Sequence, residues 1–137
     1  MIFITRRERF NAAHRLFSPT WSDEENYQVF GKCANPNFHG HNYELFVTVK
    51  GNIHKSTGYC VNLSELSSLL NEKIIKKLDH KNLNLDVDFL QGIIPTSELV
   101  AVAIWQQIEL PIKGLGAELH CVKLVETENN YVEYYGG

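Results

Sequence analysis

Three of the six histidines are spaced so that they could hold one metal ion. His39 and His41 form a His-x-His pair that leads into Asn42–Lys50, a stretch in which apolar and polar residues alternate. Residues two apart in a strand lie on the same face about 7 Å apart, so both histidines continue the apolar side of this strand. Their ring nitrogens could bind a divalent ion at about 2.0–2.1 Å. His14 follows the strand-like segment Ile2–Ala13 and becomes a third ligand if the two segments form a hairpin.

Three neutral histidines would leave one coordination position of a zinc ion free, which is the arrangement of a catalytic site. Two other interpretations remain open. The histidines could be ordinary core or surface residues, or Cys33 could complete a closed structural zinc site as a fourth ligand.

Cys33, Asp79 and His80 are candidates for proton transfer. Cys33 lies six residues before His39 in a loop rich in Gly, Asn and Pro, and a thiolate near a divalent cation can act as a base or nucleophile. A small buried residue is the alternative. Asp79 and His80 follow a predicted helix, and a carboxylate beside an imidazole holds its tautomer and raises its basicity. A helix cap would explain the same pair.

Glu126 is a candidate for ligand binding, because it ends the predicted strand Glu118–Glu126 in phase with apolar residues. A carboxylate on an apolar face is costly unless it is paired, and a ligand with two adjacent N–H donors would pair with it. A solvated strand end is the alternative. Residues Pro95-Thr96-Ser97-Glu98 indicate a helix start, with hydroxyl caps and an acidic first turn.

The elements that must position these residues follow the order strand, strand, helix, helix, strand, strand. This order predicts an α+β fold, with a four-stranded antiparallel sheet and two helices on one face. The predicted strands are Ile2–Ala13, Asn42–Lys50, Glu118–Glu126 and Tyr131–Tyr135. One predicted helix runs from Asn62 or Ser64 to about Leu78, and the other starts at Pro95–Glu98 and is ended by Pro111 and Gly114–Gly116. The intervening segment Asp79–Ile94 is predicted to be a loop, and an Asn129-Asn130 turn is expected between the last two strands.

The chain has 137 residues, of which 44% are hydrophobic and 21% charged, so we expect a single domain over residues 1–137. The net charge of −3 gives no general attraction for nucleic acid or an anionic membrane. No apolar run reaches the length of a membrane span, and the N-terminal residues do not resemble a signal peptide. Three sparse cysteines argue against a disulfide framework and favour a cytoplasmic location.

Five segments together resemble the 6-pyruvoyltetrahydropterin synthase family, which includes the 6-carboxytetrahydropterin synthases of the queuosine pathway. They run in family order over nearly the whole chain, and their combination is far more specific than any one of them. The segments are Phe10-Asn11-Ala12-Ala13-His14-Arg15-Leu16, Cys33 with His39-Gly40-His41-Asn42-Tyr43, Leu78-Asp79-His80-Lys81-Asn82-Leu83, Pro95-Thr96-Ser97-Glu98 and Glu126-Thr127-Glu128-Asn129-Asn130.

The resemblance implies the tunnelling fold, in which ββααββ subunits join edge to edge into trimeric barrels that stack as a homohexamer. It implies a lyase that acts on 7,8-dihydroneopterin triphosphate and needs no nicotinamide or flavin. The site residues that it implies are His14, His39 and His41 for zinc, Cys33 as the active-site thiol with Asp79 and His80 as proton-transfer partners across a subunit boundary, and Glu126 as the pterin anchor beside Thr96, Ser97 and Glu98.

The resemblance leaves two branches open. The five-residue gap between Cys33 and His39 and the ending Glu126–Asn130 look like the biopterin type, whereas Pro95–Glu98 looks like the queuosine type. Phe38 stands where the biopterin type often has glycine. The 6-pyruvoyl product is favoured, the 6-carboxy product is the alternative, and a non-catalytic pterin- or zinc-binding module is a more distant one.

Overall fold

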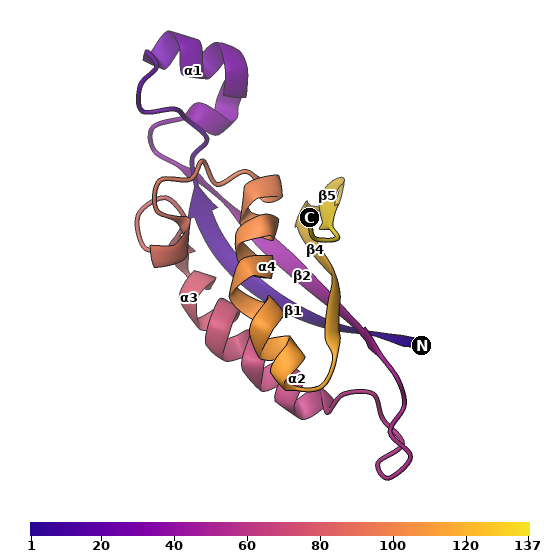
Figure 1. Cartoon of the computed structure of the whole chain (residues 1–137). Helices are drawn as coiled ribbons and strands as arrows, with labels where there is room; N and C mark the ends of the chain where they lie inside the picture. The colour runs from indigo at the N-terminus through magenta and orange to yellow at the C-terminus, as the bar shows by residue number, and fades with distance from the viewer.

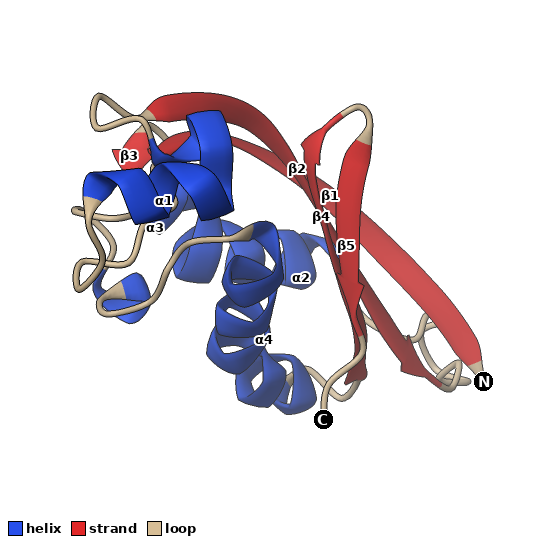
Figure 2. Ribbon diagram, turned by 90° about the horizontal axis from the view of Figure 1, so that it is seen from above, coloured by secondary structure: helices blue, strands red, loops and turns tan.

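A five-stranded sheet in the order β3-β1-β2-β4-β5 is the base of the computed structural model, which describes residues 1–137. The helices α2, α3 and α4 lie on one face of this sheet (Figure 1, Figure 2). The elements are β1 (Ile2–His14), α1 (Asp23–Phe30), β2 (His39–Gly51), α2 (Leu63–Leu70), α3 (Lys76–Leu78), β3 (Lys81–Asn82), α4 (Ser97–Gly114), β4 (Glu118–Thr127) and β5 (Asn130–Tyr134), with 3-10 turns at Gly31–Ala34 and Asp88–Leu90 and a π-helical turn at Asn71–Ile75. The α+β prediction is therefore confirmed.

The long hairpin of β1 and β2 has the face assignment that the alternating sequence predicts. Tyr43, Leu45, Val47 and Val49 of β2 are buried under the helices. β1 and β2 pair without a bulge along their whole length, and this register sets His14 directly opposite His39. The side chains of β1 therefore alternate between the two faces of the sheet without interruption as far as His14.

The prediction of four strands and of a loop over residues 79–94 needs correction. Lys81 and Asn82 form a short fifth strand, β3, which pairs in parallel with Ala12 and Ala13 of β1. A strand of two residues has no sequence period of its own, so only its position beside β1 creates it. The Glu128–Asn129 turn between β4 and β5 also lies one residue earlier than expected.

Both predicted helices are present, and their caps are the expected polar residues. The Asn62 side chain accepts hydrogen bonds from the first turn of α2, which continues through the π-helical turn into α3. Thr96 caps α4 by accepting from the Leu99 N–H group. The prediction that Gly114–Gly116 end α4 is confirmed, because the helix runs to Gly114, whereas Pro111 lies inside the helix and does not end it. The following residue Ile112 is fully buried, and this burial offsets the cost of proline in a helix.

Helix α1, which has eight residues, was not predicted from the sequence and lies in a small lobe beyond the end of β1 and the start of β2 (Figure 1). Its N-cap, Ser22, accepts a hydrogen bond from the Glu25 N–H group. The lobe closes around Asn26, whose side chain is buried. Asn26 accepts from the Ser18 N–H group at 2.7 Å and donates to the Ser18 carbonyl at 3.0 Å. Because polar contacts hold this lobe, it lacks the apolar stripe that would have revealed the helix.

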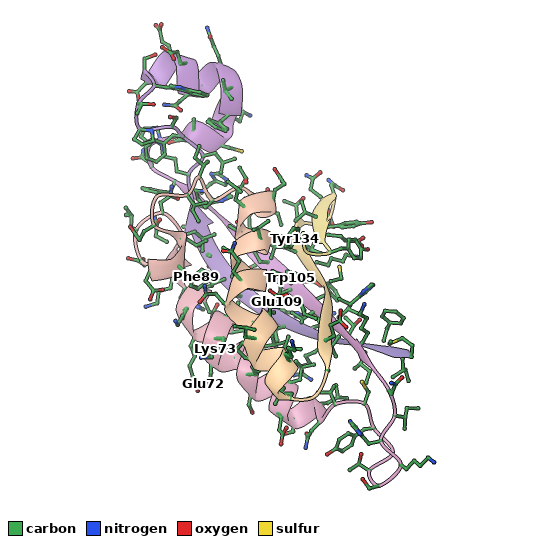
Figure 3. All side chains as sticks on the ribbon, in the orientation of Figure 1. Glu72, Lys73, Phe89, Trp105, Glu109 and Tyr134 are labelled. Atoms are coloured by element: carbon green, nitrogen blue, oxygen red, sulfur yellow. The ribbon has the colours of Figure 1, made fainter.

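The main core lies between the helices and one face of the sheet. It comprises 25 buried residues from the strands, the helices and the loop before α4. At the β5 side of this core, the ring of Trp105 from α4 packs edge to face against the ring of Tyr134 from β5, with 5.3 Å between the ring centroids (Figure 3). No helix combines the length and the apolar character needed to cross a membrane.

Candidate functional site

Three imidazole rings converge where β1 ends and β2 begins. His14 and His39 have ring centroids 4.5 Å apart, and His41 lies 5.0 Å from His14 and 4.9 Å from His39. One ring nitrogen from each lies within 4.8 Å of the others. The hairpin register produces this cluster, as predicted, because His39 and His41 occupy one face of β2 and His14 is the partner of His39.

The protein fixes the orientation of the His14 ring. Nδ1 of His14 donates to the Pro95 carbonyl oxygen at 2.9 Å, since a carbonyl can only accept, and the Tyr43 hydroxyl lies 3.3 Å from the same nitrogen. The hydrogen on Nδ1 leaves a lone pair on Nε2 of His14, which faces the cluster without a partner. A backbone carbonyl commonly orients a metal-binding histidine in this way.

Burial favours the metal-binding form of His14 and His39. Burial is the main cause that lowers the pKa of His14, and burial followed by repulsion between protonated rings of His39 and His41 lowers the pKa of His39. These two shifts favour the neutral imidazole, which is the ligand form. Buried ring nitrogens of all three histidines lack a hydrogen-bond partner. Such orphaned nitrogens are costly in a folded protein, so the residues present fit a zinc ion.

A carboxylate site adjoins the histidine cluster. The Ser97 hydroxyl donates to Oε2 of Glu126 at 2.6 Å, and Oε1 of Glu126 lies 3.6 Å from Nε2 of His41. Thr96, Ser97, Glu98 and Glu126 line a hollow of about 330 Å³ together with residues of β5. The structure thus brings together the four residues that the resemblance implied for substrate binding, and Glu126 links their hollow to the histidines.

Cys33 lies in the 3-10 turn Gly31–Ala34 and is half-buried. The end of β1 holds this turn in place, because the Cys33 carbonyl accepts from the Leu16 N–H group at 2.8 Å and the Ala34 carbonyl accepts from Nε of Arg15 at 2.8 Å. Cys33 and His39 line a common hollow of about 250 Å³. Cys33 therefore borders the same space as a member of the histidine cluster.

Asp79 and His80 lie on the outer edge of β1. Oδ1 of Asp79 accepts from the Asn11 N–H group at 2.8 Å, and the His80 N–H group donates to the Asn11 carbonyl at 2.6 Å. The hydrogen bond that Asp79 accepts from the Asn11 N–H group is the first cause that lowers the pKa of Asp79. Oδ2 of Asp79 lies 3.1 Å from Nδ1 of His80, whose side chain is 80% exposed. The pair is thus formed as an Asp-His unit that points away from the core.

The structure does not bring Asp79 and His80 to Cys33 within one chain. Asp79 lines a hollow of about 420 Å³ over the sheet, which is separate from the one that holds Cys33. A larger hollow, about 710 Å³, lies at the far end of β2 between Lys50, Trp105 and His120 and contains none of the predicted site residues. The site is identified by its converging ligand atoms, because volume alone specifies no chemistry.

Two non-glycine residues of the site region have a left-handed backbone, Phe38 with φ of 68° and His80 with φ of 60°. For such residues this conformation costs about 1 kcal/mol or more and persists only where neighbouring structure enforces it. Phe38 directly precedes His39 of the histidine cluster, and His80 is itself a candidate for proton transfer.

Sequence reasoning missed three residues that support the site. The Pro95 carbonyl that orients His14 has no signature in the sequence, because any residue has a carbonyl group. Arg15 holds the Cys33 turn, a role for which its residue type gives no specific signal. Tyr43 lies on the same face of β2 as His39 and His41, so its position beside the cluster could have been predicted from the strand phase.

Comparisons with known proteins agree with this architecture. The chain superposes on a "Structure of Caenorhabditis elegans 6-pyruvoyl tetrahydropterin synthase" with a TM-score of 0.92 and 34% identity, covering 99% of this chain and 96% of that one. A "6-pyruvoyl tetrahydrobiopterin synthase" from Pongo abelii is 48% identical over 135 residues, which are 97% of this chain and 90% of the relative. A "6-carboxy-5,6,7,8-tetrahydropterin synthase" from Bacillus subtilis (strain 168) is 32% identical over 109 residues, which are 76% of this chain and 70% of the relative.

The fold and the site define a tunnelling-fold enzyme with a histidine cluster at the end of its hairpin. A family model described as "6-pyruvoyl tetrahydropterin synthase" matches residues 3–137. The chain therefore belongs to the 6-pyruvoyl tetrahydropterin synthase family and is a lyase.

Proposed function

We propose that this lyase acts on 7,8-dihydroneopterin triphosphate with the help of zinc and eliminates triphosphate to give 6-pyruvoyltetrahydropterin. The main observation that supports the proposal is that the histidine cluster lies directly beside the hollow lined by Glu126. The orphaned ring nitrogens of the histidine cluster adjoin Glu126, whose carboxylate faces the hollow beside α4. A pterin ring and its side chain need such a pair of neighbouring subsites.

His14, His39 and His41 would hold the zinc ion, and Nε2 of His14 is the free nitrogen of that ring. When bound, zinc supplies Lewis-acid stabilisation of negative charge on an oxygen of the substrate. Burial keeps the His14 and His39 rings neutral and ready for this role.

The other residues bind the substrate or move protons. Glu126 accepts hydrogen bonds from the two adjacent N–H donors at the 2-amino-4-oxo edge of the pterin, while Ser97 holds one of its oxygens in place. Cys33, as a thiolate, removes a proton from a side-chain carbon, and the Asp79–His80 pair returns protons elsewhere. Internal redox rearrangement accompanies loss of triphosphate, so the reaction needs no redox cofactor.

We propose that a second copy of the chain supplies Asp79 and His80 to Cys33 in a homohexamer of two stacked trimeric barrels. Three observations support this arrangement. Asp79 and His80 line no common hollow with Cys33 in one chain, and the His80 side chain is exposed. β3 pairs with only Ala12 and Ala13, and Asp79 and His80 bond the backbone of Asn11, so the outer edge of β1 before Asn11 has no strand partner, and neither has the outer edge of β5. Open strand edges favour sheet-to-sheet association.

The single domain over residues 1–137 and a cytoplasmic location remain predictions. The argument for the location is the small, odd number of cysteines, three in 137 residues, which favours reduced thiols.

Turnover of the substrate is the direct test. Zinc-loaded protein incubated with 7,8-dihydroneopterin triphosphate should release triphosphate, and the mass of the pterin should be that of 6-pyruvoyltetrahydropterin. The mass of 6-carboxytetrahydropterin would instead establish the second branch, which the Bacillus subtilis relative keeps open. Absence of turnover by the zinc-loaded protein would contradict both.

Cys33→Ala distinguishes the enzyme from a binding module or a closed structural zinc site. Loss of a proton-transfer residue lowers turnover by about 10²-fold or more, while zinc content and pterin binding should stay unchanged. A variant that loses zinc would show that Cys33 is a structural ligand, and unchanged turnover would exclude Cys33 as the base.

A further inference from the structure

The backbone at Phe38 is strained for a structural reason. The Phe38 N–H group donates to the Asn35 carbonyl at 3.1 Å and closes a tight turn, in which the Asn35 side chain also accepts from the Asn37 N–H group at 2.9 Å. The next residue, His39, is already paired with His14. The turn on one side and the strand pairing on the other force the φ angle of Phe38 to 68°.

Glycine would adopt this conformation without strain, yet the chain has the bulky aromatic residue phenylalanine there. Phenylalanine at this position therefore keeps a backbone strain that glycine would remove. Strain of this kind gathers at ligand-binding and active sites, where the observed outlier justifies a hypothesis of function.

The surroundings of the Phe38 side chain indicate what that function is. Phe38 is half-buried, and it lines the hollow of about 250 Å³ that also contains Cys33 and His39. The remaining lining residues, Lys32 and Asn35, come from the same loop. The aromatic ring is thus the largest apolar group in the space next to the thiol.

We propose that Phe38 is a specificity-determining residue, whose ring limits the width of the substrate group that can reach the Cys33 thiol. The proposal rests on the proposed function in that it assigns the reacting end of the substrate to Cys33. In the proposed reaction, a slender unbranched polyol chain passes the ring and bulkier or branched side chains do not. The left-handed backbone conformation places the Phe38 side chain at the wall of the hollow, and this placement requires the strained φ angle.

The test measures access to Cys33 without using the enzymatic reaction. The full-length oligomer, wild type and variants, is treated with iodoacetamide as a small probe and N-phenylmaleimide as a bulky one. Mass spectrometry of the peptide that contains Cys33 gives the two labelling rates. Cys60 and Cys121 are only 2% and 7% exposed and serve as internal references for unfolding.

Phe38→Ala and Phe38→Gly should each raise the ratio of bulky to small labelling by at least about fivefold, within the range by which pocket walls discriminate between ligands. A smaller rise in both overturns the proposal, because a loop that merely loosens would admit both probes equally. Phe46→Ala, which removes a half-buried phenylalanine from the opposite face of β2, is the matched control and should leave the ratio unchanged.

The two variants also separate the ring from the strain. Alanine keeps a Cβ atom in the left-handed conformation and glycine does not, so Phe38→Gly should melt at a higher temperature than Phe38→Ala while both show the same labelling ratio. If Phe38→Ala fails to fold, Phe38→Gly alone decides. Failure of the wild type to turn over 7,8-dihydroneopterin triphosphate would reject the proposed function, whereas the labelling ratio judges the role of Phe38 separately.

Discussion

Removal of the Ser97 hydroxyl should weaken both the fold and substrate binding, because this group holds the Glu126 carboxylate. The oxygen–oxygen distance is 2.6 Å, and a hydrogen bond to a charged acceptor contributes about 1.5–3 kcal/mol. The Glu126 side chain is 22% exposed, so water can replace part of the lost bond, and the lower end of that range, about 1.5 kcal/mol, applies. Alanine is a better helix former than serine by about 0.5 kcal/mol. Ser97→Ala should therefore lower the free energy of unfolding by about 1 kcal/mol net.

Ser68→Ala is the matched control. Ser68 is exposed in α2, so its substitution reports the gain in helix propensity without the loss of a carboxylate partner. Urea unfolding of the two variants and the wild type at equal protein concentration measures the difference. If the lost bond also frees Glu126 from its binding position, KM for the pterin substrate should rise about tenfold, which corresponds to about 1.4 kcal/mol, with little change in kcat.

Equal stabilities of Ser97→Ala and Ser68→Ala would refute the claim that the Ser97–Glu126 bond stabilises the fold. An unchanged KM, with the loss of stability confirmed, would instead show that Glu126 keeps its place without Ser97. A fall in kcat at constant KM would place Ser97 in the chemical step and contradict a positioning role.

Three further predictions concern other parts of the molecule. The hydrogen bond from the Asn11 N–H group lowers the pKa of Asp79 below its usual range, so the stabilisation from this carboxylate is present above the ordinary aspartate pKa and is lost as the pH falls through the lowered pKa. Asp79→Asn should therefore have a lower urea midpoint than the wild type at pH 7, and the gap should close as the solution is acidified. Gly51→Ala should lower the free energy of unfolding by about 1–3 kcal/mol, because a Cβ atom there would lie 2.6 Å from Sγ of Cys60. The double variant with Cys60→Ala should recover part of this loss in urea unfolding, and no recovery would mean that the clash is elsewhere. Asn26→Ala should open the α1 lobe, since the N–H and carbonyl groups of the partly buried Ser18 would each lose a hydrogen bond worth about 1 kcal/mol. Hydrogen exchange should then increase over residues 18–30 while the sheet stays protected.

The sequence by itself was sufficient for features that depend on local periodicity. Alternation along β2 assigned Tyr43 and Val47 to the core, and the three-residue and four-residue spacing of leucines predicted α2. The caps Asn62 and Thr96 were recognisable because their side chains act within their own first turn. Each of these signals is complete within a few neighbouring residues.

The missed or misjudged elements depend on contacts between distant segments. β3 exists only because Lys81 and Asn82 lie beside β1. The last turn of α4 forms in spite of Pro111 because Ile112 is buried against the rest of the protein. The α1 lobe closes through Asn26, a residue whose type favours turns and loops as readily as helices.

The candidate site divides in the same way. The sequence determined the kinds of ligand atoms and the face on which His39 and His41 lie, since residue type and strand phase are local properties. Only the tertiary structure decided that His14 stands opposite His39, that the Pro95 carbonyl orients its ring, and that Ser97 meets Glu126. These contacts join residues far apart in the chain, and the packing of the whole core against the sheet fixes their distances.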